Sequence, residues 1–246
     1  MNPTIELLQN HRSIRRFTEQ AISEELLSQI ITAGQAAATS SYIQATSIIR
    51  VSDPDLRQAF VELSGKQRYI STCSEFLVFC ADLHRNQQRI QELGGEGDFA
   101  WTEQFLTAAL DVGLVAQNVV TAAESEGIGI CYIGGVRNDP ERVIKLLDLP
   151  KLVFPLFGLC LGYPDQHPEQ KPRLPQAVVM HHNRYSYSGI EQGLINQYDA
   201  HVKEYYIART SGKLSHTWSE QMQTVAAEQT RSFMQEILQK QGFASK

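Results

Sequence analysis

The sequence predicts an α+β fold, built as one domain with a helical extension at its C-terminal end. Three near-continuous apolar runs predict strands that are covered on both faces. A long segment with apolar and small residues on nearly every face predicts a helix that is buried all round. Because no repeat or shift in composition marks a boundary, we expect one domain over residues 1–246, with 190–246 as its helical extension.

The first half of the chain alternates helices and strands. Thr4 is expected to cap a short helix over 4–10, and Ser23 a second helix with an acidic first turn. Asp53 and Pro54 form a cap and a first-turn proline, which begin a helix that ends near Gly65. The second helix is expected to bury Leu26, Leu27, Ile30 and Ile31, and the strands of this half are 47–53 and 75–83.

The second half opens on a polar, glycine-bearing piece at 84–99, the best candidate for a mobile surface insertion. The apolar helix at 101–127 follows, placed at the centre of the domain or between subunits. Asp139 and Pro140 begin a short helix, and the prolines of 165–175 exclude regular structure. The remaining elements are strands at 127–135 and 152–164 and two amphipathic helices at 189–209 and 218–240.

Composition limits the classes of function. A net charge of -5 argues against a broad nucleic-acid or membrane surface. The N-terminus has no secretory pattern, and no apolar run approaches the roughly 20 residues of a membrane span. The four cysteines have neither disulfide-motif nor zinc spacing, and His181 and His182 have no partner ligand nearby in sequence. We expect buried, reduced thiols, no metal, and a cytoplasmic protein.

Two basic clusters stand out in this acidic chain. His11, Arg12, Ser13 and Arg15 gather two guanidiniums and a hydroxyl, which suit a phosphate group. Lys171 and Arg173 add two cations in an extended, proline-bearing stretch. Taken alone, each cluster is more often a solvated surface. Rossmann, P-loop, G-x-S-x-G and H-E-x-x-H patterns are all absent.

Three further pieces suit a flat polar ligand. Thr39, Ser40 and Ser41 offer hydroxyls, although a plain helix end explains them too. Gln67 and Tyr69 follow a helix stop and face either a cleft or solvent. Gly134 and Gly135 permit close approach of the backbone to a ligand, or simply a turn.

Taken together and in order, these pieces resemble the nitroreductase family of FMN enzymes, in its branch of oxygen-insensitive NADPH nitroreductases and NADPH:FMN oxidoreductases. The resemblance covers nearly the whole chain. It rests on the motifs HRSIRRFT at 11, SSYIQ at 40, GKQRY at 65, EFLVFCAD at 75, AAESEGIGICYIGGVRN at 122, LFGLCLGYPDQ at 156, KPRLP at 171, YYIART at 205 and TWSEQ at 217.

The resemblance implies a mixed, mostly antiparallel sheet flanked by helices and an intertwined homodimer with FMN at each subunit interface. Both basic clusters would then hold the FMN phosphate and ribityl end. Gln67 and Tyr69 would lie near the ring and ribityl chain, and Thr39, Ser40 and Ser41 would come from the other subunit. The wall beside the flavin would be Tyr132, Ile133, Gly134 and Gly135.

The resemblance also implies a reaction. NADPH would bind first, held by Arg209 and Lys213, and would leave after reducing the flavin. An electron acceptor would then bind at the same place, which is a ping-pong mechanism. The acceptors would be nitroaromatics, quinones or free flavin, and no protein acid, base or nucleophile is needed because FMN carries the chemistry. A dedicated flavin reductase and a non-catalytic flavin-storage protein are the alternatives.

Overall fold

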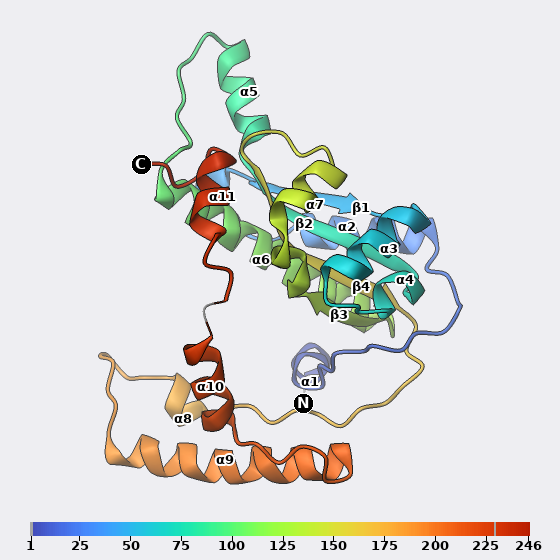
Figure 1. Cartoon of the computed structure of the whole chain (residues 1–246), viewed down its shortest axis with the longest axis vertical. Helices are drawn as coiled ribbons and strands as arrows, with labels where there is room; N and C mark the ends of the chain where they lie inside the picture. The colour runs from blue at the N-terminus through green and yellow to red at the C-terminus, as the bar shows by residue number, and fades with distance from the viewer. Residues whose placement is uncertain (1, 229) are drawn as a thin grey trace. The chain divides into compact units, whose positions relative to one another are not determined.

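Four antiparallel strands form one sheet, in the order β1-β2-β4-β3, in the computed structural model (Figure 1). The model describes residues 2–228 and 230–246. The strands are β1 (Thr46–Arg50), β2 (Glu75–Asp82), β3 (Gly129–Ile133) and β4 (Val153–Gly162). All four predicted strands are confirmed, and each is shorter than its predicted range.

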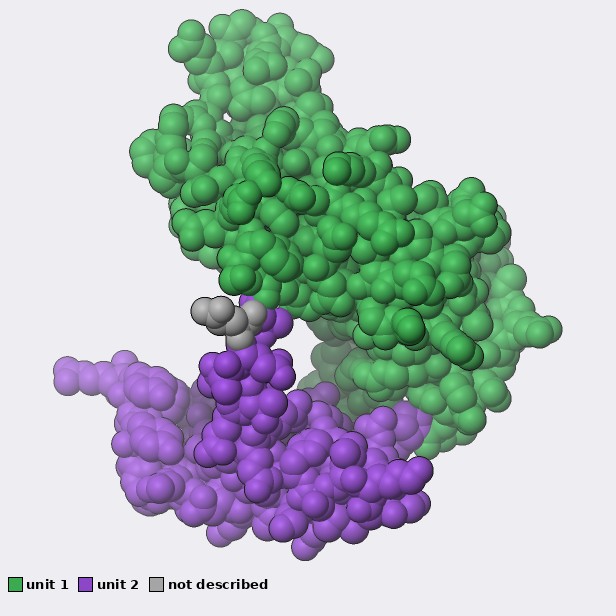
Figure 2. All heavy atoms as spheres, in the orientation of Figure 1, with its two compact units in different colours: residues 1–167, 231–246 green, residues 168–230 purple. Residues whose placement is uncertain are grey.

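The chain divides into two compact units, residues 1–167 with 231–246 and residues 168–230 (Figure 2). The sheet belongs to the first unit. The second unit contains α8 (Gln176–Val179), α9 (Gly189–Thr210) and α10 (Trp218–Ala227). As predicted, residues 165–175 contain no helix or strand.

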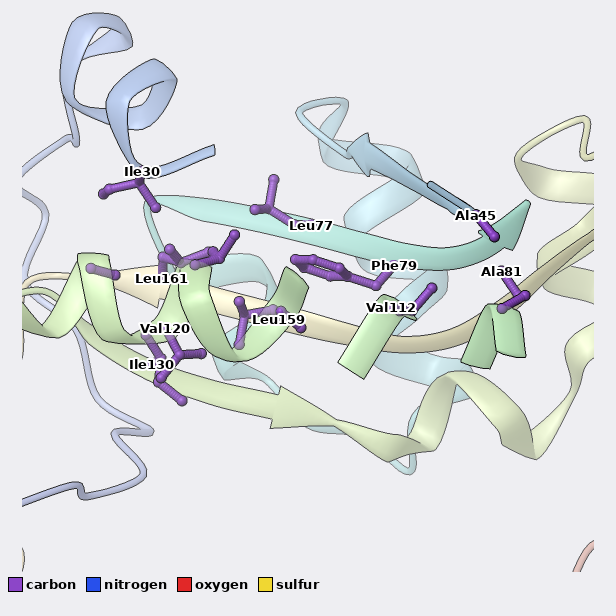
Figure 3. Packing of buried hydrophobic residues seen from close by; sticks show 14 of the residues in the cluster. Ile30, Ala45, Leu77, Phe79, Ala81, Val112, Val120, Ile130, Leu159 and Leu161 are labelled. Carbon is purple, nitrogen blue, oxygen red and sulfur yellow. The ribbon is translucent and has the colours of Figure 1, made fainter. Parts of the chain in front are cut away.

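Strand β2 lies in the interior of the sheet and is buried along its whole length. Its residues alternate between the two faces, as strand geometry requires. Leu77 and Phe79 face the core beneath α2 (Glu24–Gln35) and α6 (Thr102–Ser125), where they pack with Leu159 and Leu161 of β4 (Figure 3). The proline in β4, Pro155, lies where the β2–β4 register shifts, so its missing N–H interrupts the ladder at a bulge.

The opposite face of the sheet packs a second core. Phe76, Val78 and Cys80 of β2 point into it, and Phe60 stacks edge-on against Phe76 at 5.2 Å between ring centroids. All four cysteines are buried and free, as predicted. The elements covering this face are α3 (Pro54–Leu63), α4 (Tyr69–Thr72), the 3₁₀ helix η2 (Gly134–Asn138) and α7 (Pro140–Leu146). Asp53 and Asp139 cap α3 and α7 as expected.

Within one chain, helix α6 is buried on one face only, so its predicted placement at the centre of the domain is wrong, whereas placement between subunits stays a prediction. Val112, Ala116 and Val119 are fully buried against the sheet side. On the other side Leu110 is 69% exposed, with Leu106 and Leu114 one turn away on either side also exposed. By length and composition α6 is also apolar enough to cross a membrane, which we did not expect, but a third of that stretch is buried inside the protein.

The polar piece at 84–99 contains a helix, α5 (His84–Glu92), and is fastened to the rest of the first unit at both ends. Arg85 and Asn86 donate to the carbonyls of Thr46 and Ile43. At the other end Lys246 forms an ion pair with Asp98. Contacts distant in sequence therefore hold a segment whose polarity and glycines suggested only a surface insertion.

Two expectations for the chain ends need correction. Helix α1 (Pro3–Gln9) is capped by Asn2, whose side chain accepts from the Thr4 amide at 2.9 Å, so Thr4 is not the cap. The second C-terminal helix is divided into α10 and α11 (Met234–Lys240), with Arg231 in a left-handed conformation between them. The division has a packing reason, because α10 stacks on α9 while Ile237 of α11 joins the core of the first unit.

Candidate functional site

The first basic cluster lies on a segment that extends the sheet beside β3. Ser13 forms a parallel bridge to Ile130, and the Ile14 amide donates to the Ile130 carbonyl at 2.8 Å. Ile14 turns into the core and is only 6% exposed. A Cβ on Gly129 would lie 2.6 Å from the Ile14 side chain, so glycine permits this close approach. Because side chains alternate along an extended segment, Arg15 points away from Ile14.

Arg15 reaches two side chains of other elements. Its guanidinium interacts with the Tyr69 hydroxyl of α4 and with the Cys131 thiol of β3. Burial raises the pKa of Tyr69 to about 12, against the opposing effect of the Arg15 charge. Burial likewise raises the pKa of Cys131, so this thiol stays protonated and unreactive. The structure thus brings Arg15 and Tyr69 together from positions 54 residues apart, as the site prediction requires.

Gln67 lies two residues before Tyr69, in the turn after α3. Its Oε1 atom is buried and has no hydrogen-bond partner among the described residues. Buried polar atoms in proteins are nearly always paired, so an unpaired one calls for an explanation. A ligand that donates a hydrogen bond would satisfy this oxygen.

The glycine pair after β3 has two distinct environments. A Cβ on Gly135 would lie 2.7 Å from the Ser64 Cα, so this glycine is required by packing of η2 against the end of α3. A Cβ on Gly134 would meet only the Arg137 guanidinium, at 3.8 Å. The protein itself therefore leaves room beside Gly134 but not beside Gly135.

Glu124, near the C-terminal end of α6, was not predicted as a site residue. Its Oε1 lies 2.6 Å from His11 Nδ1, and both side chains are partly buried. Burial raises the pKa of Tyr132 to about 12, and the Glu124 charge adds to this effect. The carboxylate orients His11 by holding one ring nitrogen, in the way that outer partners orient functional histidines.

Two arginines beside the glycine pair were also missed. Arg231 donates to the Gly134 carbonyl at 3.2 Å and to the Asn138 side chain at 2.9 Å. Burial, together with the nearby Arg231 charge, lowers the pKa of Arg137. Neither arginine forms an ion pair with a carboxylate within the described part of the chain. Their sequence context, VRN and TRS, carries no signal that would have revealed the pair.

Thr39, Ser40 and Ser41 lie elsewhere on the first unit. Thr39 and the Ser40 amide bind Asp111 of α6, whereas His11 binds Glu124 of the same helix. These two positions are 13 residues apart on one helix, which corresponds to about 20 Å. Within one chain the structure therefore does not bring these three residues to the His11 cluster.

The remaining predicted residues lie in the second unit. Lys171 stands over the Tyr206 ring of α9 at 5.3 Å, and Arg173 donates to the Lys171 carbonyl. Arg209 donates to the Tyr205 hydroxyl at 2.8 Å, one turn earlier on α9. Lys213 is exposed in the turn after α9. Within this unit Lys171 and Arg209 thus contact neighbouring tyrosines of one helix.

Arg12 and Arg16 differ in what they bind. Arg12 donates to the Asn10 carbonyl at 2.9 Å, which leaves it within the basic cluster. Arg16, which is not among the predicted site residues, donates to the Asp165 carbonyl at 2.8 Å and so connects this segment to the chain just after β4.

Comparison with known proteins gives matches along almost all of the chain. Residues 8–163 match the family model described as "Nitroreductase family", and residues 171–246 match "Nitroreductase family, C-terminal domain". The chain is 43% identical to the oxygen-insensitive NADPH nitroreductase of Salmonella typhimurium over 246 residues, covering 100% of both. It is also 43% identical to an FMN reductase (NADPH) of Bacillus subtilis, covering 99% of both.

Solved structures agree with these matches. NfrA1 nitroreductase from B. subtilis superimposes with a TM-score of 0.95 at 42% identity, over 99% of this chain and 100% of that one. The NADPH:FMN oxidoreductase from Vibrio harveyi, solved with NAD+, gives a TM-score of 0.91 at 40% identity, over 100% of both chains.

Proposed function

Because the chain belongs to the nitroreductase family, we propose that it is an FMN-dependent NADPH oxidoreductase. It moves two electrons from NADPH to nitroaromatics, quinones or free flavin by a ping-pong mechanism. FMN, when bound, supplies the hydride and electron chemistry. The protein binds FMN, orients it, and positions NADPH and the acceptor in turn.

The observation that carries this proposal is the buried Oε1 atom of Gln67, which has no hydrogen-bond partner in the part of the chain that the structure describes. It lies two residues from Tyr69, which the Arg15 guanidinium contacts. Beside Gly134, the nearest protein atom to an added Cβ is the Arg137 guanidinium, at 3.8 Å. A hydrogen-bond acceptor at Gln67, a cation at Arg15 and a stretch of backbone at Gly134 that a ligand can approach suit a flat heterocycle with polar edges and an anionic tail. These residues therefore fit FMN.

Each residue of the first cluster has a role set by its chemistry. Arg12 and Arg15 offer paired N–H donors to phosphate or ribityl oxygens, and the Ser13 hydroxyl adds a neutral donor. His11, held through Nδ1 by Glu124, presents its other ring nitrogen to the ligand. We propose that Lys171 and Arg173 complete this binding set.

The NADPH contacts follow from charge. Arg209 and Lys213 are exposed cations on either side of the end of α9, and they suit the 2′-phosphate that distinguishes NADPH from NADH. A storage protein has no need of such contacts, so these residues favour the enzyme over a non-catalytic flavin carrier.

We further propose a homodimer, working in the cytoplasm, in which the partner's α6 covers the exposed leucine face. Leu106, Leu110 and Leu114 form an apolar stripe that a monomer would leave in water. The separation of Thr39 from His11 along α6 supports the same arrangement, because Thr39, Ser40 and Ser41 are then free to contribute to the partner's site.

The relatives do not separate a general nitroreductase from a dedicated flavin reductase, since both names occur at 43% identity. Turnover should therefore be compared on a nitroaromatic, a quinone and free FMN, with each acceptor varied at several fixed concentrations of NADPH. Parallel double-reciprocal lines are expected for a ping-pong mechanism. Turnover of free FMN alone would assign the narrower activity, and no reduction of bound FMN by NADPH would favour storage.

A further inference from the structure

The segment from Thr39 to Ala45, here the 39–45 loop, has an unusual backbone. Ser41, Tyr42 and Gln44 have φ values of 49°, 57° and 50°, and none of them is glycine. The left-handed region is costly for residues with a side chain, and it persists only where surrounding contacts impose it. Three such residues within four positions require an identifiable restraint.

Asp111 of α6 supplies that restraint. Its carboxylate is 2% exposed and accepts three hydrogen bonds from the loop. The Thr39 hydroxyl donates at 2.5 Å and the Ala45 amide at 3.2 Å to one oxygen, and the Ser40 amide donates to the other at 3.1 Å. A buried carboxylate is stable only when it is paired in this way. Asp111 thus joins the start of the loop to its end.

Two further contacts restrain the middle and the end of the loop. The Gln44 amide donates to the Thr39 hydroxyl oxygen at 2.8 Å, so the same hydroxyl both donates to Asp111 and accepts from the loop. Asn86 of α5 donates to the Ile43 carbonyl at 3.0 Å. Ala45 is fully buried in the core shown in Figure 3, whereas Tyr42 at the tip is 80% exposed. The base is fixed while the tip is presented outward.

We propose that Asp111 is a positioning residue, which holds the 39–45 loop in its left-handed conformation so that Ser40 and Ser41 are preorganised for ligand binding. This inference rests on the proposed function, because the ligands are FMN and the electron acceptor, bound at the site to which the loop contributes. Asn86 is the second restraint, so the first turn of α5 also stabilises this loop. Preorganisation lowers the ordering cost of binding.

An asparagine at position 111 cannot replace the carboxylate. Its single oxygen accepts at one side, and its amide group turns N–H donors toward the other. Whichever way the amide is oriented, the Ser40 amide or the Ala45 amide loses its acceptor. Asp111→Asn therefore keeps the size of the side chain while releasing one end of the loop.

The experiment uses the full-length protein loaded with FMN, and compares Asp111→Asn with Asp82→Asn. Asp82 is a matched control, since it is also buried and its side chain accepts from a hydroxyl, that of Ser47 at 2.5 Å. Its side chain bonds to Ser47 and Arg85 and not to the 39–45 loop; only its backbone amide reaches the loop, at the Ala45 carbonyl, and Asp82→Asn leaves that amide in place. Asn86→Ala is the second variant, which decides the question if Asp111→Asn does not fold. The measurements are amide hydrogen exchange over 39–45, the Kd for FMN, and KM and kcat for a quinone acceptor.

Asp111→Asn is expected to exchange faster over 39–45 and to raise the FMN Kd and the acceptor KM by about 3- to 10-fold, with kcat within about twofold. Asn86→Ala is expected to shift the same quantities in the same direction, and Asp82→Asn to shift none of them. Unchanged Kd and KM despite faster exchange, or equal effects from Asp82→Asn, would overturn the positioning role. If the wild-type protein binds no FMN, the proposed function fails as well. If the wild-type protein binds FMN and turns over normally while the variants give either contradicting result, only the positioning role of Asp111 is lost.

Discussion

The glycine pair after β3 offers a direct comparison of a structural and a ligand-facing position. In Gly135→Ala the new Cβ would lie 2.7 Å from the Ser64 Cα and 3.1 Å from its carbonyl oxygen. These are backbone atoms of a neighbouring element, so the structure must shift. Overpacking of this kind costs about 1 to 3 kcal/mol. For a chain of this length that corresponds to a fall in Tm of roughly 2 to 12 °C.

Gly134→Ala is the matched variant. Its Cβ would meet only Arg137, at 3.8 Å, so the apoprotein should keep its Tm within about 2 °C. If Gly134 faces the flavin as proposed, the added methyl group should nevertheless weaken FMN binding.

Thermal unfolding of both apoproteins and fluorescence titration with FMN measure the two effects separately. An unchanged Tm for Gly135→Ala would refute the packing argument. Normal FMN affinity in Gly134→Ala would refute the placement of this backbone beside the ligand.

Three other predictions concern charge. Arg15→Ala should lose a charge-assisted contact worth about 1.5 to 3 kcal/mol, which raises the FMN Kd roughly 10- to 150-fold. Arg16→Ala is its control, because Arg16 binds the Asp165 carbonyl instead, and equal losses in equilibrium titrations would contradict the assignment. Arg209→Ala should raise KM for NADPH while FMN stays bound; steady-state kinetics with an unaltered KM would remove Arg209 from the NADPH site. Tyr69 and Tyr132 hold their protons more tightly when folded, with pKa values raised by burial from 10 to about 12. Their contribution to stability is therefore present below pH 10 and lost as the pH rises toward 12. Urea unfolding between pH 9 and 11.5 should show this loss, reduced in Tyr132→Phe, and a midpoint independent of pH would contradict it.

The sequence predicted those parts of the fold that depend on neighbouring residues. The apolar run of β2 and the caps at Ser23, Asp53 and Asp139 are local signals, and the structure follows them. The division between α10 and α11 was missed because both halves have helical periodicity. What separates them is that Ile237 packs into a core distant in sequence, and periodicity does not report on that.

The same limit applies to the candidate site. The basic cluster at His11 and the glycine pair were visible as short motifs, but the partners that position them were not. Glu124 binds His11 across 113 residues of chain, and Asp111 binds Thr39 across 72. A single acidic residue on a helix leaves no local pattern that distinguishes it from a solvated side chain. The exposed face of α6 was missed for a related reason, because apolar residues on all sides of a helix do not reveal which side meets the sheet.

The absorbance spectrum of the purified protein, reconstituted with FMN and then mixed with NADPH without oxygen, shows directly whether the chain is an FMN-dependent NADPH oxidoreductase. We expect a yellow protein that retains FMN through gel filtration and is bleached by NADPH. A protein that stays colourless after incubation with FMN, or one whose bound FMN is not bleached by NADPH, would contradict it.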